Sequence, residues 1–290
     1  MKFLVAESET AEHRAERRER AGKSSGESFQ ATLEQMVPDA EVTRVEPADA
    51  DGDRMDADAI ARFDAVFLTG SPLHVYEDAP EVQRQIAFMR AVFDSGVPSF
   101  GSCAGMQVAV AAAGGRVRAM PERLEAAVAR RITRTEQGRD HPLLAGRTPA
   151  WDTAAIHTDE VEELPEGATL LASNGVTRVQ AAEIRSGRGV FWGVQYHPEL
   201  SPGEIASAIR AQAASLVEAG LASDADAVER RAGLLDRIHR DPDDHAARWE
   251  LGVDDEFAHE DRRRVEIANF IAAIPNLRNT DRAGPSGEPG

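Results

Sequence analysis

The sequence predicts an α/β fold: an open, mainly parallel sheet flanked by helices, with an antiparallel extension and a small C-terminal helical appendage. Three observations support this. In the first half, short apolar runs alternate with helical stretches, the pattern of right-handed crossovers between parallel strands. From residue 116 the runs follow one another between turn residues, which favours antiparallel pairing. From Ala222 the composition shifts to Asp, Arg and Glu with scattered Leu and Ile, typical of surface helices.

The parallel strands are expected where short apolar runs end in polar or turn residues. Residues 63–70 are largely apolar, as expected for a strand covered on both faces. We expect the Arg- and Glu-rich residues 7–28 to be partly mobile and residues 49–58 to form a solvated acidic loop. The expected strands span 1–6, 41–45, 63–70 and 98–103, and the expected helices span 28–36, 80–93 and 106–113.

The second half is expected to form the antiparallel extension and then helices. A helix over 202–221 places Ile205, Ile209 and Leu216 on one face. The expected extension strands span 116–120, 129–133, 154–157, 169–172, 176–184 and 189–197, and the appendage helices span 225–239, 243–251 and 261–274.

The chain divides into three expected parts. With 290 residues, of which 42% are hydrophobic, it can bury one sizeable core. Residues 1–221 hold every expected strand and form the main domain, and residues 222–279 form the helical appendage. Residues 280–290, rich in Gly and Pro, are expected to be a disordered tail.

Charge and cysteine content exclude several kinds of partner. The formal net charge is −17, and nucleic-acid backbones and anionic membranes repel such a surface, so neither is expected to bind. One cysteine permits no internal disulfide. The apolar run 3–5 is far too short for a signal or membrane segment, so we expect a cytoplasmic protein.

Cys103 lies at the break between the expected strand 98–103 and the helix that follows. Gly101 and Gly105 flank it, as a sharp strand-to-helix turn requires, because the backbone is strained and a neighbouring chain approaches closely. The turn places the sulfur at a helix N-terminus, where the dipole and free N–H groups favour a thiolate. A lone cysteine is more often a small buried hydrophobe. The flanking glycines favour a nucleophile instead.

A nucleophile needs a base, and His197 is the candidate. His197 and Glu199 are two residues apart, so an extended backbone places both side chains on one face. A carboxylate beside an imidazole fixes its tautomer and stabilises the imidazolium. A histidine alone would more often be structural, but together with the cysteine turn the pattern indicates a triad of Cys103, His197 and Glu199.

Acyl transfer also needs hydrogen-bond donors for the tetrahedral oxyanion. The backbone N–H of Ala104, directly after the nucleophile, is one candidate. Gly70 and Ser71 follow the neighbouring parallel strand, and the backbone N–H of Ser71 is the second candidate. The carboxyl ends of parallel strands meet at one edge of a sheet, where ligands bind.

Four segments together resemble one family. Residues 101–107 (GSCAGMQ) resemble the nucleophile turn of class I glutamine amidotransferases, and residues 195–199 (QYHPE) resemble their His/Glu motif. Residues 69–72 (TGSP) resemble the oxyanion turn, and residues 157–165 (HTDEVEELP) resemble the His-Gly-Asp-x-Val stretch of the glutaminase domain of GMP synthase. Their order and separation agree over roughly residues 1–221, and jointly the motifs are specific.

The resemblance implies a flavodoxin-like domain that hydrolyses the side-chain amide of glutamine to glutamate and ammonia. Cys103 would form a glutamyl thioester, and His197 would protonate the ammonia and activate water. Gln107 is similar to the motif glutamine that lines the substrate pocket; the alternative is an ordinary polar residue on the helix. Glutamine is then the substrate. The chain shows no phosphate loop or pyrophosphatase motif, so a separate synthetase is the expected acceptor of the ammonia.

Two residues depart from the family pattern. Ser71 stands where many members have a second glycine, and Thr158 replaces the motif glycine; both keep the backbone donor but change the pocket wall. The appendage lies outside the shared domain and resembles extensions of stand-alone GMP-synthase-like amidotransferases. No oligomeric state follows from its pattern.

Two other functions remain open. A γ-glutamyl hydrolase or peptidase would use the same triad on a γ-glutamyl amide or peptide, and would differ in the pocket beyond the scissile nitrogen. His74 and Tyr76, just after the oxyanion turn, either line that side or are surface loop residues. A non-catalytic binding module is disfavoured because all three triad residues are present.

No metal or cofactor is expected. The residues that a zinc-type site could use are Cys103, His157, Asp159, His197 and Glu199. Their spacing matches no metal-ligand motif, so a metal site is disfavoured.

Overall fold

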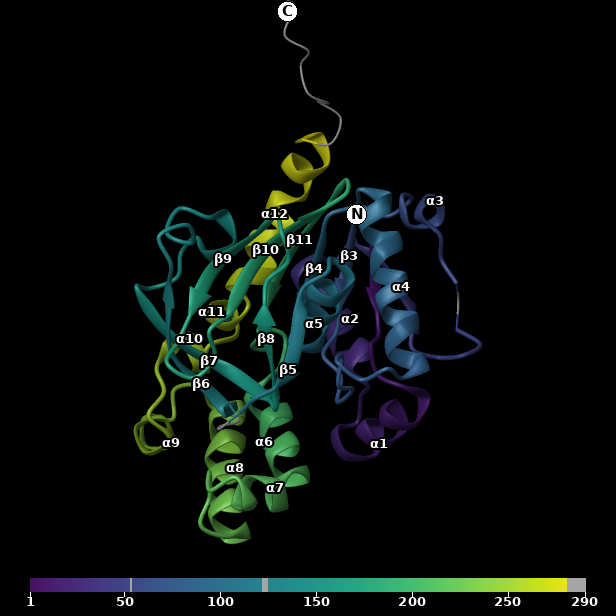
Figure 1. Ribbon diagram of the computed structural model, residues 1–290. Helices are drawn as coiled ribbons and strands as arrows, with labels where there is room; N and C mark the ends of the chain where they lie inside the picture. Colours follow the sequence, from purple (N-terminus) through teal and green to yellow (C-terminus); the bar gives the residue numbers. More distant parts are fainter. Residues whose placement is uncertain (53, 122–124, 281–290) are drawn as a thin grey trace, which may run out of the picture.

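The computed structural model describes residues 1–52, 54–121 and 125–280, and it confirms the α/β fold (Figure 1). The strands are β1 (Lys2–Ala6), β2 (Glu41–Val45), β3 (Ala65–Leu68), β4 (Ser99–Ser102), β5 (Arg116–Ala119), β6 (Glu125–Arg134), β7 (Ala150–His157), β8 (Asp159–Glu163), β9 (Ala168–Ser173), β10 (Ala181–Ser186) and β11 (Gly189–Val194). The helices are α1 (Ala11–Ala21), α2 (Ser25–Met36), α3 (Ala57–Ile60), α4 (Pro80–Ser95), α5 (Ala104–Ala112), the 3-10 helix η1 (Pro142–Leu144), α6 (Pro202–Ala211), α7 (Ala213–Glu218), α8 (Ala225–Arg240), α9 (His245–Leu251), α10 (Asp255–Ala258), α11 (Glu260–Arg263) and α12 (Val265–Thr280).

One sheet of nine strands runs through the molecule in the order β2-β1-β3-β4-β11-β10-β9-β6-β7. Neighbours from β2 to β11 pair in parallel, and neighbours from β11 to β7 pair antiparallel. The predicted parallel half and antiparallel extension are therefore one continuous sheet. Strands β5 and β8 form a separate antiparallel pair.

The carboxyl ends of β3, β4 and β11 are neighbours at one edge of the sheet. Leu68 pairs with Gly101, and Val194 pairs with Ser102, so the three strands end at nearly the same level. The residues that directly follow these strands are consequently brought together, although they are far apart in the sequence.

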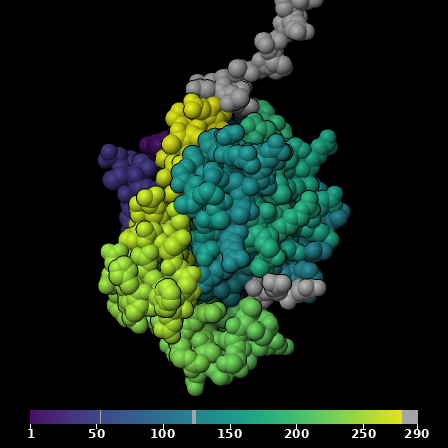
Figure 2. All heavy atoms as spheres, turned by 90° about the vertical axis from the view of Figure 1, so that its left-hand side faces the viewer, coloured from purple at the N-terminus to yellow at the C-terminus, as the bar shows by residue number. Residues whose placement is uncertain are grey.

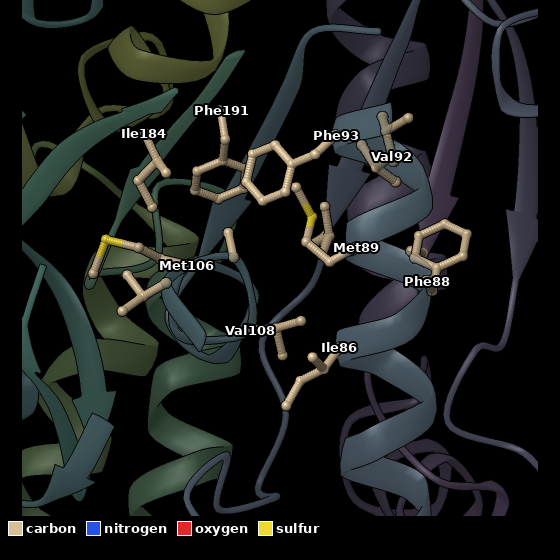
Figure 3. Packing of buried hydrophobic residues seen from close by; sticks show 14 of the residues in the cluster. Ile86, Phe88, Met89, Val92, Phe93, Met106, Val108, Ile184 and Phe191 are labelled. Atoms are coloured by element: carbon tan, nitrogen blue, oxygen red, sulfur yellow. The ribbon is translucent and has the colours of Figure 1, made fainter. Parts of the chain in front are cut away.

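Both faces of the parallel half are buried, which explains its continuous apolar runs. In β1, the side chain of Leu4 packs in a core covered by α4 and α5. The side chains of Phe3 and Val5, on the opposite face, pack in a second core beneath α2 and α12. In the first core Phe93 of α4 lies beside Phe191 of β11 (Figure 3).

The structure corrects the expectation that residues 7–28 are partly mobile. They contain helix α1 and the start of α2. The side chain of Thr10 caps the N-terminus of α1, and Arg14, which is buried, pairs with Asp49 at 2.5 Å. Arg14 is the one buried residue within α1, so an apolar periodicity could not reveal this helix.

Other boundaries also differ from the expected ones. Strand β8 was not predicted, because four of its five residues are acidic. The expected helix over 202–221 is divided into α6 and α7 at Gln212. The expected strand over 176–184 begins only at Ala181, since residues 174–177 form a hydrogen-bonded turn.

The C-terminal helices pack on the sheet in two places. α12 adds Ile267, Phe270 and Ile274 to the core beneath the parallel half, and α8 packs with α6 against β6 and β7. Figure 2 shows the residues of α12, coloured yellow, beside the teal residues of the antiparallel extension. The domain division at residue 222 remains a prediction.

The predicted tail, residues 280–290, begins with the last residue of α12 and otherwise lies outside the described residues. Among the helices that the structure describes, none is long and apolar enough to cross a membrane.

Candidate active site

Cys103 lies on a sharp turn between β4 and α5. Its φ of 52° and ψ of −115° belong to a sparsely populated region that costs on the order of 1–3 kcal/mol for a residue with a Cβ. The turn is held by a hydrogen bond of 2.8 Å from the Cys103 N–H to the carbonyl of Val194. An added Cβ at Gly105 would lie 2.5 Å from the carbonyl oxygen of Leu68, so only glycine fits there. The backbone strain thus falls on the residue predicted to be the nucleophile.

His197 and Glu199 follow β11 and lie directly beside the cysteine turn. The Nδ1 atom of His197 is 2.8 Å from Oε1 of Glu199, and both side chains are buried. A Cβ added at Gly70 would lie 2.7 Å from Cε1 of His197 and 3.7 Å from Cβ of Cys103. The structure therefore brings the ends of β3, β4 and β11 into one site, in which Gly70 lies close to both His197 and Cys103.

Ser102 is a member of this group that sequence reasoning missed. Its hydroxyl donates a hydrogen bond of 2.8 Å to Oε1 of Glu199, the same oxygen that contacts His197. Ser102 is the last residue of β4 and is fully buried. Its position directly before Cys103 was the available signal. However, only the adjacency of β4 and β11 shows what it contacts.

Electrostatics favour a charged imidazole in this site. Burial alone lowers the pKa of His197, but the charges of Glu199 and Cys103, and hydrogen bonds to both, raise it to about 10. Such a histidine carries a proton at neutral pH. The group can therefore present a protonated imidazole next to a sulfur nucleophile, the requirement for expelling an amine from an amide.

Gln107 and Ser71 line the same cavity, which has a volume of about 470 Å³. The Gln107 amide donates to the carbonyl of Asp159 and to Oε1 of Gln195, at 3.2 Å each, and the Gln195 amide contacts Sγ of Cys103 at 3.6 Å. Gln195 is fully buried behind these residues, and its contact with the sulfur was not predicted. Ala104 is the first residue of α5, so its N–H has no partner within the helix.

Asp159 and His157 also line the cavity. The carboxylate of Asp159 is 2.7 Å from Nδ1 of His74, and the His74 ring stacks on Tyr76 with 5.4 Å between centroids. Asp159 therefore links the cavity that holds the cysteine to the loop of His74. His74 and Tyr76 are not among the described residues that line the cavity, and they are partly exposed, at 39% for the His74 side chain and 45% for Tyr76.

The outer part of the cavity is walled by α1 on one side and by α6 and α7 on the other (Figure 1). Glu9, His13 and Arg17 line it from the α1 side, and Glu204 and Ala208 line it from α6. Sequence reasoning missed this wall because α1 was not expected to be a helix.

A metal centre has no support in the described residues. Nowhere in residues 1–52, 54–121 and 125–280 do three or more His, Cys, Asp or Glu side chains form a group that could hold a metal ion.

Fold and site geometry together define an α/β protein whose cavity ends on a cysteine at a strand-to-helix turn, beside a histidine paired with a glutamate. A family model, glutamine amidotransferase class-I, matches residues 24–214. The chain belongs to the class-I glutamine amidotransferase family.

Two curated relatives differ in how much of them the chain covers. The chain is 38% identical over 240 residues to a gamma-glutamyl-L-1-hydroxyisopropylamide hydrolase of a Pseudomonas species, covering 81% of this chain and 80% of that protein. It is 35% identical over 155 residues to a glutamine-hydrolysing GMP synthase of Leifsonia xyli, covering 53% of this chain but 29% of the synthase.

A solved structure shares the fold. The chain superposes on a glutamine amidotransferase of Thermotoga maritima with a TM-score of 0.63 and 12% identity, covering 94% of this chain and 97% of that one. A glutamine amidotransferase of Methylobacillus flagellatus gives a TM-score of 0.54 at 17% identity, covering 100% of this chain and 99% of that one.

Proposed function

We propose that this protein hydrolyses γ-glutamyl amides, with Cys103 as nucleophile, His197 as general acid and base, and Glu199 as the residue that orients His197. The Sγ thiolate of Cys103 attacks the γ-carbonyl carbon. The resulting oxyanion accepts hydrogen bonds from the backbone N–H groups of Ala104 and Ser71. His197 gives its proton to the departing nitrogen, the C–N bond breaks, and a γ-glutamyl thioester remains on Cys103.

Hydrolysis of the thioester restores the site. His197, now neutral, takes a proton from a water molecule as the water attacks the thioester carbonyl. The C–S bond breaks, glutamate leaves, and the thiolate and protonated imidazole are regenerated. Glu199 stabilises the charged imidazole through its contact with Nδ1.

The observation that carries this proposal over simple glutamine hydrolysis is the outer part of the cavity. The leaving nitrogen must lie on the side of His197, since His197 protonates it. From there the cavity continues between α1 and α6, and its volume of about 470 Å³ is within the range for drug-sized ligands, roughly 300–1,000 Å³. Ammonia needs no such space, so the cavity favours a substituted amine as leaving group. The similarity to a γ-glutamyl amide hydrolase over 80% of that protein agrees with this choice.

Glutamine hydrolysis with transfer of ammonia to a separate synthetase is the second candidate. The similarity to GMP synthases supports it, although the chain spans 29% of the first of them. The triad chemistry is the same for both candidates, and they differ only in the leaving group. A cytoplasmic location remains a prediction for either.

The test compares kcat/KM for γ-glutamyl-ethylamide and for glutamine. We expect kcat/KM to be higher for the alkyl amide by about 10-fold or more, because burying one or two additional carbon groups in a pocket contributes a preference of about that size. Cys103→Ser should abolish both activities. Ala208→Phe, which fills the outer cavity, should reduce turnover of the alkyl amide and spare that of glutamine. Equal or better turnover of glutamine in the wild type would support the second candidate instead.

A further inference from the structure

The loop of residues 196–200, which carries His197 and Glu199, is held at both ends by the C-terminal helices. The hydroxyl of Tyr196 donates a hydrogen bond of 2.7 Å to Oε1 of Glu266 in α12. At the other end, Nε of Arg263 in α11 donates to the carbonyl of Leu200 at 3.0 Å. Tyr196 and Glu266 are fully buried, and Arg263 is 3% exposed.

Glu266 is itself fixed in position. Both of its oxygens contact Arg147, at 2.7 Å from Nε and 2.6 Å from Nη2. Arg147 also contacts Glu256 of α10 at 2.6 Å and the carbonyl of Arg263 at 3.1 Å. Burial lowers the pKa of Arg147, but the charge and hydrogen bonds of Glu266 raise it well above its ordinary range. The Tyr196 hydroxyl therefore donates to a carboxylate that Arg147 holds through two hydrogen bonds.

Arg263 is held in a different way. Its guanidinium donates to the carbonyl oxygens of Phe257 and Ala258 as well as to that of Leu200, each at 3.0 Å. Within the described part of the chain, Arg263 takes part in no ion pair. Burial lowers the pKa of Arg263 to about 10, so the side chain is still charged at neutral pH. Burying a cation that is hydrogen-bonded only to neutral carbonyl groups lowers the stability of the folded protein. However, the Arg263 side chain hydrogen-bonds both to α10 and to the catalytic loop, which an apolar side chain could not do.

Arg263 and Glu266 lie beyond the segment 24–214 that the family model matches, whereas the loop that they contact lies within it. We propose that Arg263 and Glu266 are positioning residues that hold His197 and Glu199 in their reactive arrangement, which makes the C-terminal helices part of the active-site support. This inference rests on the proposed function. A displacement of about 1 Å at a reacting group can cost about 100-fold in rate. Loss of the hydrogen bond at either end of this five-residue loop is therefore expected to lower the rate of catalysis.

The test uses Tyr196→Phe, which removes only the hydroxyl, and Arg263→Met, which keeps the length of the side chain but removes its donors. The matched control is Asn269→Ala. Asn269 lies in α12 and donates to the carbonyls of Leu143 and Ala145, away from the catalytic loop. Two readouts are needed: kcat and KM for γ-glutamyl-ethylamide, and the pH dependence of Cys103 alkylation by iodoacetamide.

We expect Tyr196→Phe and Arg263→Met each to lower kcat by about 10- to 100-fold with KM within about 2-fold, and to shift the pH midpoint of alkylation. Asn269→Ala should lower Tm but leave kcat and the midpoint unchanged. The proposal is overturned if Tyr196→Phe and Arg263→Met only lower Tm, as the control does. If Arg263→Met does not fold, the kcat and the alkylation midpoint of Tyr196→Phe alone test the proposal.

Alkylation needs no substrate, so it separates the two claims. A wild type that cleaves no γ-glutamyl compound contradicts the proposed function. The alkylation profiles of the variants still support or overturn the positioning role.

Discussion

Among the residues that the structure describes, two buried histidine–glutamate pairs lie near the cavity, and they differ in how completely they are hydrogen-bonded. His157 contacts Glu125 through Nε2 at 3.1 Å and the carbonyl of Asp159 through Nδ1 at 2.9 Å, so both of its ring nitrogens are occupied by fixed groups. His197 uses Nδ1 for Glu199, and its remaining hydrogen-bonding capacity faces Cys103.

The carboxylates differ in the same way. Glu125 accepts hydrogen bonds from Asn174, Thr177 and Gln180 as well as from His157. Within the described part of the chain, Oε2 of Glu199 is buried and has no hydrogen-bond partner. The same two residue types thus form a fully hydrogen-bonded network in one place and an incompletely bonded pair in the other. Unused hydrogen-bonding capacity, rather than residue type, distinguishes the pair that we propose to be catalytic.

The largest effect is expected from replacing His197, which breaks the pair proposed to be catalytic. His197→Gln should lower kcat by about 100- to 10,000-fold, because the general acid and base is removed, and should lower Tm less than His157→Gln does. His157→Gln should do the reverse and mainly lower Tm. Steady-state kinetics and thermal unfolding of the two variants check this, and a similar loss of kcat in both would contradict the distinction.

Removing the carboxylate of the structural pair tests its role in stability. Glu125→Ala leaves several buried donors without an acceptor and should lower the free energy of unfolding by about 3–5 kcal/mol. Urea denaturation measures this value. A loss below about 1 kcal/mol would show that the network is not structural.

The third prediction sharpens the description of the reactive pair. Ser102→Ala removes one hydrogen bond to the Glu199 carboxylate, a bond worth about 1.5–3 kcal/mol. We expect kcat to fall by about 10-fold with KM unchanged, because Glu199 then holds His197 less firmly. Ser99→Ala, on the same strand but bonded to the carbonyl of Val190, is the matched control and should keep its kcat.

The smallest expected effects concern pH, and the two pairs should respond at opposite ends of the scale. Burial raises the pKa of Glu125, but hydrogen bonds and the charge of His157 lower it overall. Its stabilisation is therefore present above the unfolded pKa, about 4.3, and is lost as pH falls through the folded pKa. The pKa of His197 is raised, so its stabilisation is present below about 6.5 and is lost as pH rises toward about 10.

Unfolding free energies of wild type, Glu125→Gln and His197→Gln as a function of pH check these signs. The Glu125 variant should lose part of the acid-side dependence, and the His197 variant part of the alkaline-side dependence. Parallel curves for all three proteins would contradict both pKa shifts.

Sequence reasoning could propose His197 and Glu199 as a catalytic pair because the signals it used are local. The glycines around Cys103 and the two-residue spacing of His197 and Glu199 are visible in short segments, and the order of parallel strands brings such segments to one edge. Gly70 was found for the same reason, as a glycine at a strand end.

The residues that were missed act through contacts between distant segments. Ser102 meets Glu199 only because β4 lies beside β11, and Arg263 meets Leu200 only because the C-terminal helices fold back. Helix α1 was missed because its buried residue is an arginine, which carries no apolar pattern. Hydrogen-bonded polar contacts over long sequence separations leave no periodic signal.

The most direct test of the central claim is to trap the γ-glutamyl thioester. Wild type is mixed with γ-glutamyl-ethylamide, quenched in acid and digested, and the peptide that carries Cys103 is examined by mass spectrometry. The account predicts a γ-glutamyl group on Cys103 and none on the same peptide of Cys103→Ser, which should also release no ethylamine. Continued release of ethylamine by Cys103→Ser, with no adduct in the wild type, would contradict it.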